Sequence, residues 1–357
     1  MTYKVIQWST GNVGSHAVRL IAEHPDLELV GLWVHSEEKA GRDAGEIVGI
    51  DPVGVTATND IDALLALDAN CVCYTATADL RPAEAIADMA RIAASGKNIV
   101  SSSVVPLVFP PHVEPSMRKP LEDACDAASV SCFTSGIDPG WANDLLPLVL
   151  TGQCEYIDTL RVMEVVNYAT YAQPTVLFDT MGFGQALDST PLLLIPGVLS
   201  FAWGGTVKAL AAGLGVELDE LREVHERLPA EETIDLGFGV VEKGTTAAMR
   251  FEVQGILDGE PRIILEHVTR LDDALAPDWP QPAGHSGYRV IVSGNPNYTC
   301  DVQMMGDDGD HNTAGLVGTA ARLVNAIPAV CDAAPGLLSV LDLPLIPGRG
   351  LMRRRSK

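Results

Sequence analysis

A glycine-rich segment near the N-terminus has the residue types and spacing of a phosphate-binding loop. The segment Ser9-Thr10-Gly11-Asn12-Val13-Gly14 follows an apolar run, residues 4–8, and opens an amphipathic stretch, residues 13–23. It matches the GxGxxG pattern with serine in place of the first glycine. Gly11 would let the backbone approach a pyrophosphate, Gly14 would let the helix pack on the strand, and amides at the helix N-terminus would stabilise phosphate charge. We predict that all six residues contact a dinucleotide; a tight turn without ligand is the alternative.

The residues that follow the second apolar run, 27–34, bear on the choice of cofactor. Enzymes that use NAD usually carry an acid there, which binds the ribose 2′-hydroxyl. This chain has no acid before Glu37. The side chains near this point suit a 2′-phosphate instead, so the sequence favours NADP over NAD, with solvated loop charges as the alternative interpretation of the two cations. The predicted contacts are His35, Ser36, Lys39 and Arg42.

Small hydroxyl residues follow two later predicted strands. Loops after the carboxyl ends of parallel strands line the cofactor crevice in such sheets, so these residues are predicted to edge the ribose and nicotinamide. Ordinary turn chemistry is the alternative. The residues are Thr75, Ala76 and Thr77 after the fourth strand, and Ser101 and Ser102 at the fifth.

The elements that must position these residues alternate between strand and helix. This alternation predicts an α/β fold with a Rossmann-type parallel sheet in residues 1–140. The expected strands are residues 4–8, 27–34, 53–57, 71–75, 98–102 and 130–134, and the expected helices are 13–23, 60–67, 82–94 and 114–128.

After residue 140 the pattern changes to helices followed by β-rich runs, which predicts an α+β domain with an antiparallel sheet over residues 141–311. Residues 312–357, a helix near 312–325 and a proline-rich end, are expected to complete the first domain. The expected helices are 142–150, 175–185, 192–214 and 218–227, and the expected strands are 232–241, 246–257, 262–271, 287–293 and 298–305.

Composition excludes several classes of protein. A net charge of −23 over 357 residues argues against binding to nucleic acid, which needs clustered lysine and arginine. The longest apolar stretch, residues 191–203, is too short and too interrupted to span a membrane, and no secretory signal is visible, so we expect a cytoplasmic protein. The seven cysteines have no CxxC pair and are expected to be free thiols.

Six segments together carry a resemblance to a known family. They are STGNVG, WVHSEEKAGRDAGE, SGKNIVSSS, GIDPGWANDLLP, YATYAQPTVLFDTMGFG and TAARLVNAIPAVCDAAPG, which are spread over nearly the whole chain. With these segments the chain resembles the dihydrodipicolinate-reductase-like oxidoreductases, and within them it is most similar to 2,4-diaminopentanoate dehydrogenase and the native amine dehydrogenases. The resemblance implies a homodimer, a nicotinamide cofactor in the first domain, and hydride exchange with a C=N or C=O carbon of a small substrate held in a cleft.

One position departs from what the resemblance implies. In the amine dehydrogenases we expect a carboxylate shortly after the fifth strand, where it holds ammonia and polarises the imine. The matching place here is Val104, and residues 99–113 contain no acid. An ammonium or iminium ion in an apolar site would lack a counter-charge there, whereas reduction of a ketone, an aldehyde or a preformed imine would not need one. The expected substrate-pocket residues are Val104, Trp141, Asn143 and Phe178.

The proton donor for a developing alkoxide must come from the chain, because the cofactor supplies only the hydride. We predict Tyr168 and Tyr171 as the catalytic candidates. Asp138 is interpreted as a turn-former before a helix and His311 as a structural residue. His267 has no partner at a recognisable spacing, and no metal-binding motif is present, so no metal is expected.

The sequence therefore predicts an NAD(P)H-dependent oxidoreductase that transfers hydride to a C=O or C=N carbon of a small, largely apolar substrate. The alternative is a catalytically silent NADP-binding sensor or partner-binding protein. Reduction of dihydrodipicolinate itself would need a basic pocket for two carboxylates, and the second domain shows no such cluster.

Overall fold

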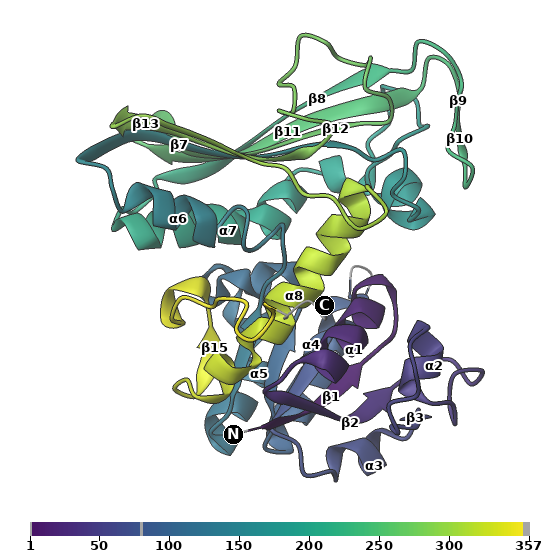
Figure 1. Cartoon of the computed structure of the whole chain (residues 1–357). Coiled ribbons are helices and arrows are strands. Elements are labelled where there is room, and N and C mark those ends of the chain that lie inside the picture. The colour runs from purple at the N-terminus through teal and green to yellow at the C-terminus, as the bar shows by residue number, and fades with distance from the viewer. Residues whose placement is uncertain (1, 79–80, 353–357) are drawn as a thin grey trace. The chain divides into compact units, whose positions relative to one another are not determined.

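The computed structural model describes residues 2–78 and 81–352, and the chain forms two compact units (Figure 1). Unit 1 consists of Met1–Ile137 and Leu316–Lys357, and unit 2 consists of Asp138–Gly315. Each unit has its own sheet and hydrophobic core.

Unit 1 contains a seven-stranded sheet in the order β15-β6-β5-β4-β1-β2-β3. Every strand pair in it is parallel, which confirms the predicted Rossmann-type α/β sheet. The strands are β1 (Tyr3–Trp8), β2 (Leu27–Trp33), β3 (Ala57–Thr58), β4 (Cys71–Tyr74), β5 (Asn98–Ser101), β6 (Ser131–Thr134) and β15 (Gly336–Leu338).

Helices pack on both faces of this sheet because its strands are apolar on both sides. Along β1, Val5 belongs to one core cluster, with α1 and α8, while Ile6 belongs to the other, with α4 and α5. Each fully buried side chain of this size contributes about 1.5–3 kcal/mol to folding. The helices are α1 (Asn12–Glu23), α2 (Ala44–Val48), α3 (Ile61–Leu65), α4 (Pro82–Ala94), α5 (Pro115–Ala128) and α8 (His311–Cys331), with short 3₁₀ turns at Val105–Val108, Pro110–His112 and Val340–Asp342.

Among the described residues one helix, α8, is long and apolar enough to cross a membrane by length and composition alone. Its side chains Leu323, Val324 and Ile327 are buried in the core of unit 1. A core helix passes the same test of length and composition.

Unit 2 contains a six-stranded sheet in the order β14-β13-β7-β12-β11-β8. Four neighbouring pairs are antiparallel, and β7 and β12 run parallel, so the predicted antiparallel sheet is mixed. Two helices, α6 (Leu145–Thr151) and α7 (Val198–Leu214), lie against one face of it (Figure 1). The strands are β7 (Tyr156–Asn167), β8 (Glu220–Pro229), β11 (Thr246–Leu257), β12 (Glu260–Arg270), β13 (Gly287–Asn295) and β14 (Tyr298–Val302).

Two predictions of secondary structure in unit 2 were wrong. Residues 218–227, expected to be a helix, form most of the edge strand β8, because their backbone pairs with β11 along its whole length and this overrides a weak helical pattern. The strand β7 was missed, although it lies at the centre of the sheet. Both errors concern strands whose partners are distant in sequence.

Several predicted boundaries also differ from the structure. The helix expected over 192–214 is a short turn, Leu192–Leu194, followed by α7, because Gly197 adopts a φ of 91° between them. The strand expected over 232–241 is two short strands, β9 (Ile234–Asp235) and β10 (Val240–Val241). The stretch expected as helix over 175–185 is a six-residue π-helix, Thr175–Thr180.

Candidate active site

The glycine-rich loop of unit 1 lies at the carboxyl end of β1 and leads directly into α1. Ser9, which stands where the pattern has its first glycine, adopts a left-handed φ of 83°. A side chain on Gly14 would place its Cβ 2.3 Å from the Ser9 carbonyl oxygen and 2.7 Å from Thr75 Oγ1, so this position requires glycine. A Cβ on Gly11 would meet no atom within 4 Å. The loop is therefore packed tightly against the sheet at one glycine and open at the other, as phosphate binding requires.

Gln7, on strand β1, hydrogen-bonds to the loop, and this role was not identified from the sequence. Its side-chain Nε2 donates to the Ser9 carbonyl oxygen at 2.9 Å and to Thr75 Oγ1 at 2.8 Å, and Thr75 Oγ1 donates to the Trp8 carbonyl oxygen at 3.1 Å. Gln7 is fully buried. A polar residue inside an otherwise apolar strand was the signal that could have indicated this role.

Lys39 is the predicted 2′-phosphate contact that reaches the loop. Its Nζ donates to Thr10 Oγ1 at 3.0 Å and to the Thr10 carbonyl oxygen at 3.3 Å. His35 and Arg42 are exposed, and Ser36 Oγ accepts a hydrogen bond from a neighbouring backbone amide. A cation therefore lies beside the phosphate loop at the end of β2.

The predicted hydroxyl residues lie at the carboxyl ends of β4 and β5, on the same sheet edge as the loop. Ser101 is buried and its Oγ accepts from the Ser103 amide at 2.9 Å, while Ser103 Oγ donates to the Ala76 carbonyl oxygen. Thr77 is exposed. These bonds tie the two loops together beside the place where a nicotinamide nucleotide would lie, and the structure thus collects the predicted cofactor residues at one edge of unit 1.

Val104 has an unusual backbone conformation. It is buried and adopts a left-handed φ of 55° immediately before the Val105–Val108 turn. A β-branched residue is strained in this region, and such strain, of order 1–3 kcal/mol, concentrates at functional sites.

In unit 2 the two predicted catalytic tyrosines stack on each other, with ring centroids 4.6 Å apart. The Tyr168 hydroxyl donates to Glu164 Oε2 at 3.0 Å. Burial, and next the Glu164 charge, raise the pKa of Tyr168 well above its ordinary value, so this phenol keeps its proton at neutral pH.

Glu164 belongs to a buried cluster with Asp138 and His267. His267 Nδ1 lies 3.2 Å from Glu164 Oε2, and His267 Nε2 lies 3.2 Å from Asp138 Oδ2. The side chains of all three are 7% exposed or less. Trp203 Nε1 donates to Asp138 Oδ1 at 3.1 Å, and this bond holds the Asp138 carboxylate in place. We call Asp138, Glu164 and His267 the acid–histidine cluster.

Strand register brings this cluster together. His267 on β12 is the direct neighbour of Glu164 on β7, Tyr288 on β13 is its neighbour on the other side, and Phe251 on β11 lies next to His267. The His267 ring stacks on Phe251 at 4.7 Å and meets Trp203 edge-on at 4.9 Å. A row of side chains across four strands thus surrounds the imidazole.

The charge state of the cluster follows from these contacts. Burial disfavours protonation of the His267 imidazole, but the nearby Asp138 and Glu164 carboxyl groups outweigh it and raise its pKa to about 10. The ring is then an imidazolium at neutral pH. Two acidic side chains therefore share this one imidazolium.

This arrangement differs from the sequence interpretation, in which His267 had no partner and Asp138 formed a turn. The three residues come from separate segments of the chain and lie close together in the fold, and no local sequence pattern predicts their contact. Their donor atoms lie within 4.8 Å of one another, a spacing that a metal site would also need. A metal ion bound there would have to displace a proton from the His267 imidazolium.

The other predicted substrate-pocket residues of unit 2 lie apart from the cluster's hydrogen bonds. Asn143 is buried and its Oδ1 accepts from the Gly140 amide at 3.0 Å. Phe178 fills the space over Gly239, whose Cβ would lie 2.4 Å from the ring, and Trp141 is half-buried. His311, interpreted from the sequence as a structural residue, has Nδ1 3.2 Å from the Met304 carbonyl oxygen.

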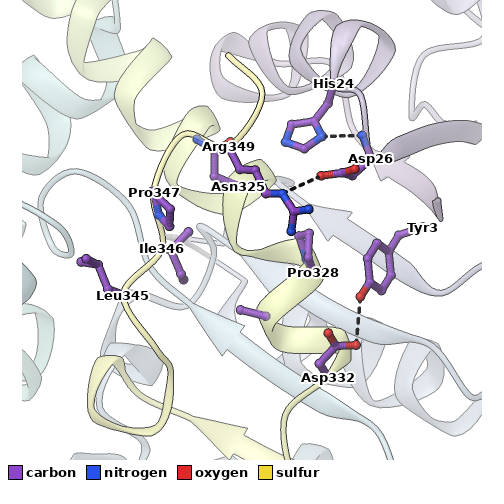
Figure 2. Close-up of a pocket in the computed structure, with 11 residues that line it drawn as sticks. Tyr3, His24, Asp26, Asn325, Pro328, Asp332, Leu345, Ile346, Pro347 and Arg349 are labelled. Carbon is purple, nitrogen blue, oxygen red and sulfur yellow. Dashed lines mark hydrogen bonds and ion pairs between the residues drawn. The ribbon is translucent and has the colours of Figure 1, made fainter. Parts of the chain in front are cut away.

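A separate cavity of about 380 Å³ lies at the opposite, amino-terminal edge of the unit 1 sheet (Figure 2). In it the Tyr3 hydroxyl donates to Asp332 Oδ1 at 2.9 Å, and Arg349 Nε lies 3.7 Å from Asp26 Oδ2 (Figure 2). Dinucleotides bind at the carboxyl ends of parallel strands, so this cavity is not the cofactor site.

The fold and the phosphate loop define the class of the protein. A parallel sheet with this loop before the first helix is the arrangement that binds dinucleotides in NAD(P)-dependent oxidoreductases.

Comparison with known proteins identifies the family. Residues 141–355 match the 2,4-diaminopentanoate dehydrogenase C-terminal domain, and residues 5–103 match the N-terminus of dihydrodipicolinate reductase. The chain belongs to this family of NAD(P)-dependent dehydrogenases, as the resemblance predicted. It is 43% identical to an amine dehydrogenase from Streptomyces virginiae over 98% of both chains.

Two further relatives agree with this assignment. The chain is 24% identical to 2,4-diaminopentanoate dehydrogenase from Acetoanaerobium sticklandii, over 96% of this chain and 93% of the relative. The solved structure of amine dehydrogenase from Mycobacterium smegmatis has a TM-score of 0.75 and 18% identity over 98% of both chains, which shows the shared fold.

Proposed function

We propose that this chain is an amine dehydrogenase that interconverts a small, largely apolar amine and the corresponding carbonyl compound. In the direction of oxidation, an alkylammonium ion, water and NADP⁺ give the carbonyl compound, an ammonium ion, NADPH and a proton. The observation that carries the proposal is the phosphate loop at Ser9–Gly14, because its geometry supports dinucleotide binding in unit 1, and a bound nicotinamide dinucleotide would supply hydride chemistry. The relatives named amine dehydrogenase support amines as the substrate class.

The side chains of this chain have separate tasks in that reaction. The amides at the start of α1 and Lys39 would hold the phosphates, and the cofactor supplies the hydride acceptor when bound. In unit 2 the aromatic rings of Trp203 and Phe251 enclose the acid–histidine cluster, and they favour an apolar substrate.

The proposal is tested by following absorbance at 340 nm with NADPH and a panel of ketones and aldehydes, each with and without ammonium chloride. We expect turnover that requires ammonium. Turnover without ammonium would make the protein a carbonyl reductase, and tight NADPH binding without any turnover would indicate the silent binding protein.

We propose NADP as the preferred cofactor, on the position of Lys39 beside the loop and the lack of an acid at the end of β2. Replacing Lys39 by alanine should raise KM for NADPH about tenfold or more and change KM for NADH less than threefold, because a phosphate loses a charge-assisted hydrogen bond. Lys4→Ala, at the other end of the sheet, is the matched control. Equal effects on both cofactors would contradict the preference.

We also propose that the chain forms a homodimer through the face of the unit 2 sheet that α6 and α7 leave uncovered. By alternation along β12, Glu266 points away from the side of His267, and its Oε1 pairs with Arg250 Nε at 2.6 Å. Glu252 on the same face pairs with Arg161 at 2.8 Å. Because these charges are paired within the chain, the same face of a second copy could pack against this face across a twofold axis. Light scattering should give twice 37.9 kDa, and a mass of 37.9 kDa would exclude the dimer.

A further inference from the structure

We propose that the acid–histidine cluster of Asp138, Glu164 and His267 is the subsite that binds the nitrogen of the substrate, as ammonium or iminium. This inference rests on the proposed amine dehydrogenase function. It assigns to unit 2 the counter-charge that residues 99–113 of unit 1, which contain no acid, do not supply.

The carboxylates of the acid–histidine cluster have more hydrogen-bond acceptor sites than there are donors facing them. Two carboxylates offer about eight lone-pair sites. In the part of the chain that the structure describes, the donors that face them are the hydroxyls of Tyr168 and Tyr288, the Trp203 indole and the two ring nitrogens of His267, each 3.2 Å from a carboxylate oxygen. Acceptors therefore exceed donors. A buried group with spare acceptors suits a ligand that brings N–H bonds.

The His267 ring is close to Asp138 but poorly aligned with it. Its Nε2 is buried and lies 3.2 Å from Asp138 Oδ2, yet it makes no aligned hydrogen bond among the described residues. Its other nitrogen faces Glu164. A buried donor that is close to its acceptor but misaligned is satisfied when a further polar group enters beside it.

Acidic groups outnumber cationic groups in the cluster. Two acidic side chains share this one cation, and the Phe251 ring stacks on the imidazole while the Trp203 ring meets it edge-on. An isolated buried charge is unfavourable, and an organic monocation removes that penalty. A neutral ketone or alcohol would not.

A carbonyl compound and an ammonium ion would condense to an iminium ion and water, and hydride supplied by bound NADPH would give the neutral amine. A proton from solvent would then convert the amine to the alkylammonium ion. Glu164 would contact the nitrogen and is the catalytic residue in this scheme, while His267 and Asp138 position its carboxylate.

The test compares Glu164→Gln with Glu260→Gln, which removes the same charge from the exposed start of β12. At saturating ketone and NADPH, Glu164→Gln should raise KM for ammonium about 10- to 100-fold, because a charge-assisted contact becomes a neutral one. The control should stay within twofold. NADPH binding by both variants, followed by fluorescence, should match the wild type.

A second measurement covers the case in which Glu164→Gln folds poorly. Cyclohexylammonium chloride should compete with ammonium in the wild type, whereas cyclohexanol should not, and Glu164→Asp should restore part of the affinity. An unchanged KM for ammonium in a folded, active Glu164→Gln enzyme would overturn this inference and leave the proposed function intact. A wild type that never needs ammonium would instead overturn the proposed function.

Discussion

Replacing His267 by leucine should lower the free energy of unfolding by about 3–5 kcal/mol, because it leaves the carboxylates of Asp138 and Glu164 buried without their shared cation. Urea unfolding followed by circular dichroism measures this change. His285→Leu is the matched control, since that side chain is 92% exposed and 3.8 Å from Asp273, and it should change stability by less than about 0.5 kcal/mol. A loss below 1 kcal/mol at His267 would contradict an imidazolium between two charges.

The wild type and the His267→Leu variant should differ in how their free energy of unfolding depends on pH. The pKa of His267 is about 10 in the folded chain and near the ordinary 6.5 when unfolded, so the raised value stabilises the fold fully below pH 6.5. That contribution is lost as the pH rises from 6.5 to 10. The groups that face the ring are Asp138 and Glu164, with Tyr168 and Tyr288 beyond them. Wild-type stability should fall over this interval, and the His267→Leu profile should be flatter there.

Replacing Gly14 by valine should weaken NADPH binding by about 100-fold or more. The added Cβ would lie 2.3 Å from the Ser9 carbonyl oxygen, which is backbone and cannot rotate away, so the loop and the start of α1 must separate. The amides that would hold the phosphates then lose their alignment. Titration of NADPH fluorescence measures the change in Kd.

Gly11→Ala separates cofactor contact from folding in the same loop. Its φ is −73°, and its Cβ meets no atom of the described chain within 4 Å, so the variant should melt within about 2 °C of the wild type. It should still bind NADPH more weakly, because the methyl group would enter the space that a phosphate needs. If Gly14→Val bound NADPH normally, the loop would not be the cofactor site.

Much of unit 1 was predictable from the sequence because its features are local. The phosphate loop is six consecutive residues, and most of the strands are followed along the chain by a helix, so alternating patterns sufficed to predict a parallel sheet, although not its edge strand β15. The family assignment also rested on contiguous motifs.

Only the tertiary structure revealed the acid–histidine cluster and the edge strand β8. Asp138, Glu164 and His267 lie far apart in sequence and meet because β12 pairs in parallel with β7, in a register that sets His267 beside Glu164. A shift of one residue would point His267 to the other face of the sheet. Likewise residues 220–229 are a strand because β11 offers them hydrogen bonds. Residue types and local spacing determined how the nucleotide-binding unit would fold, whereas strand register, which depends on distant pairing, decided which charged side chains share one buried site.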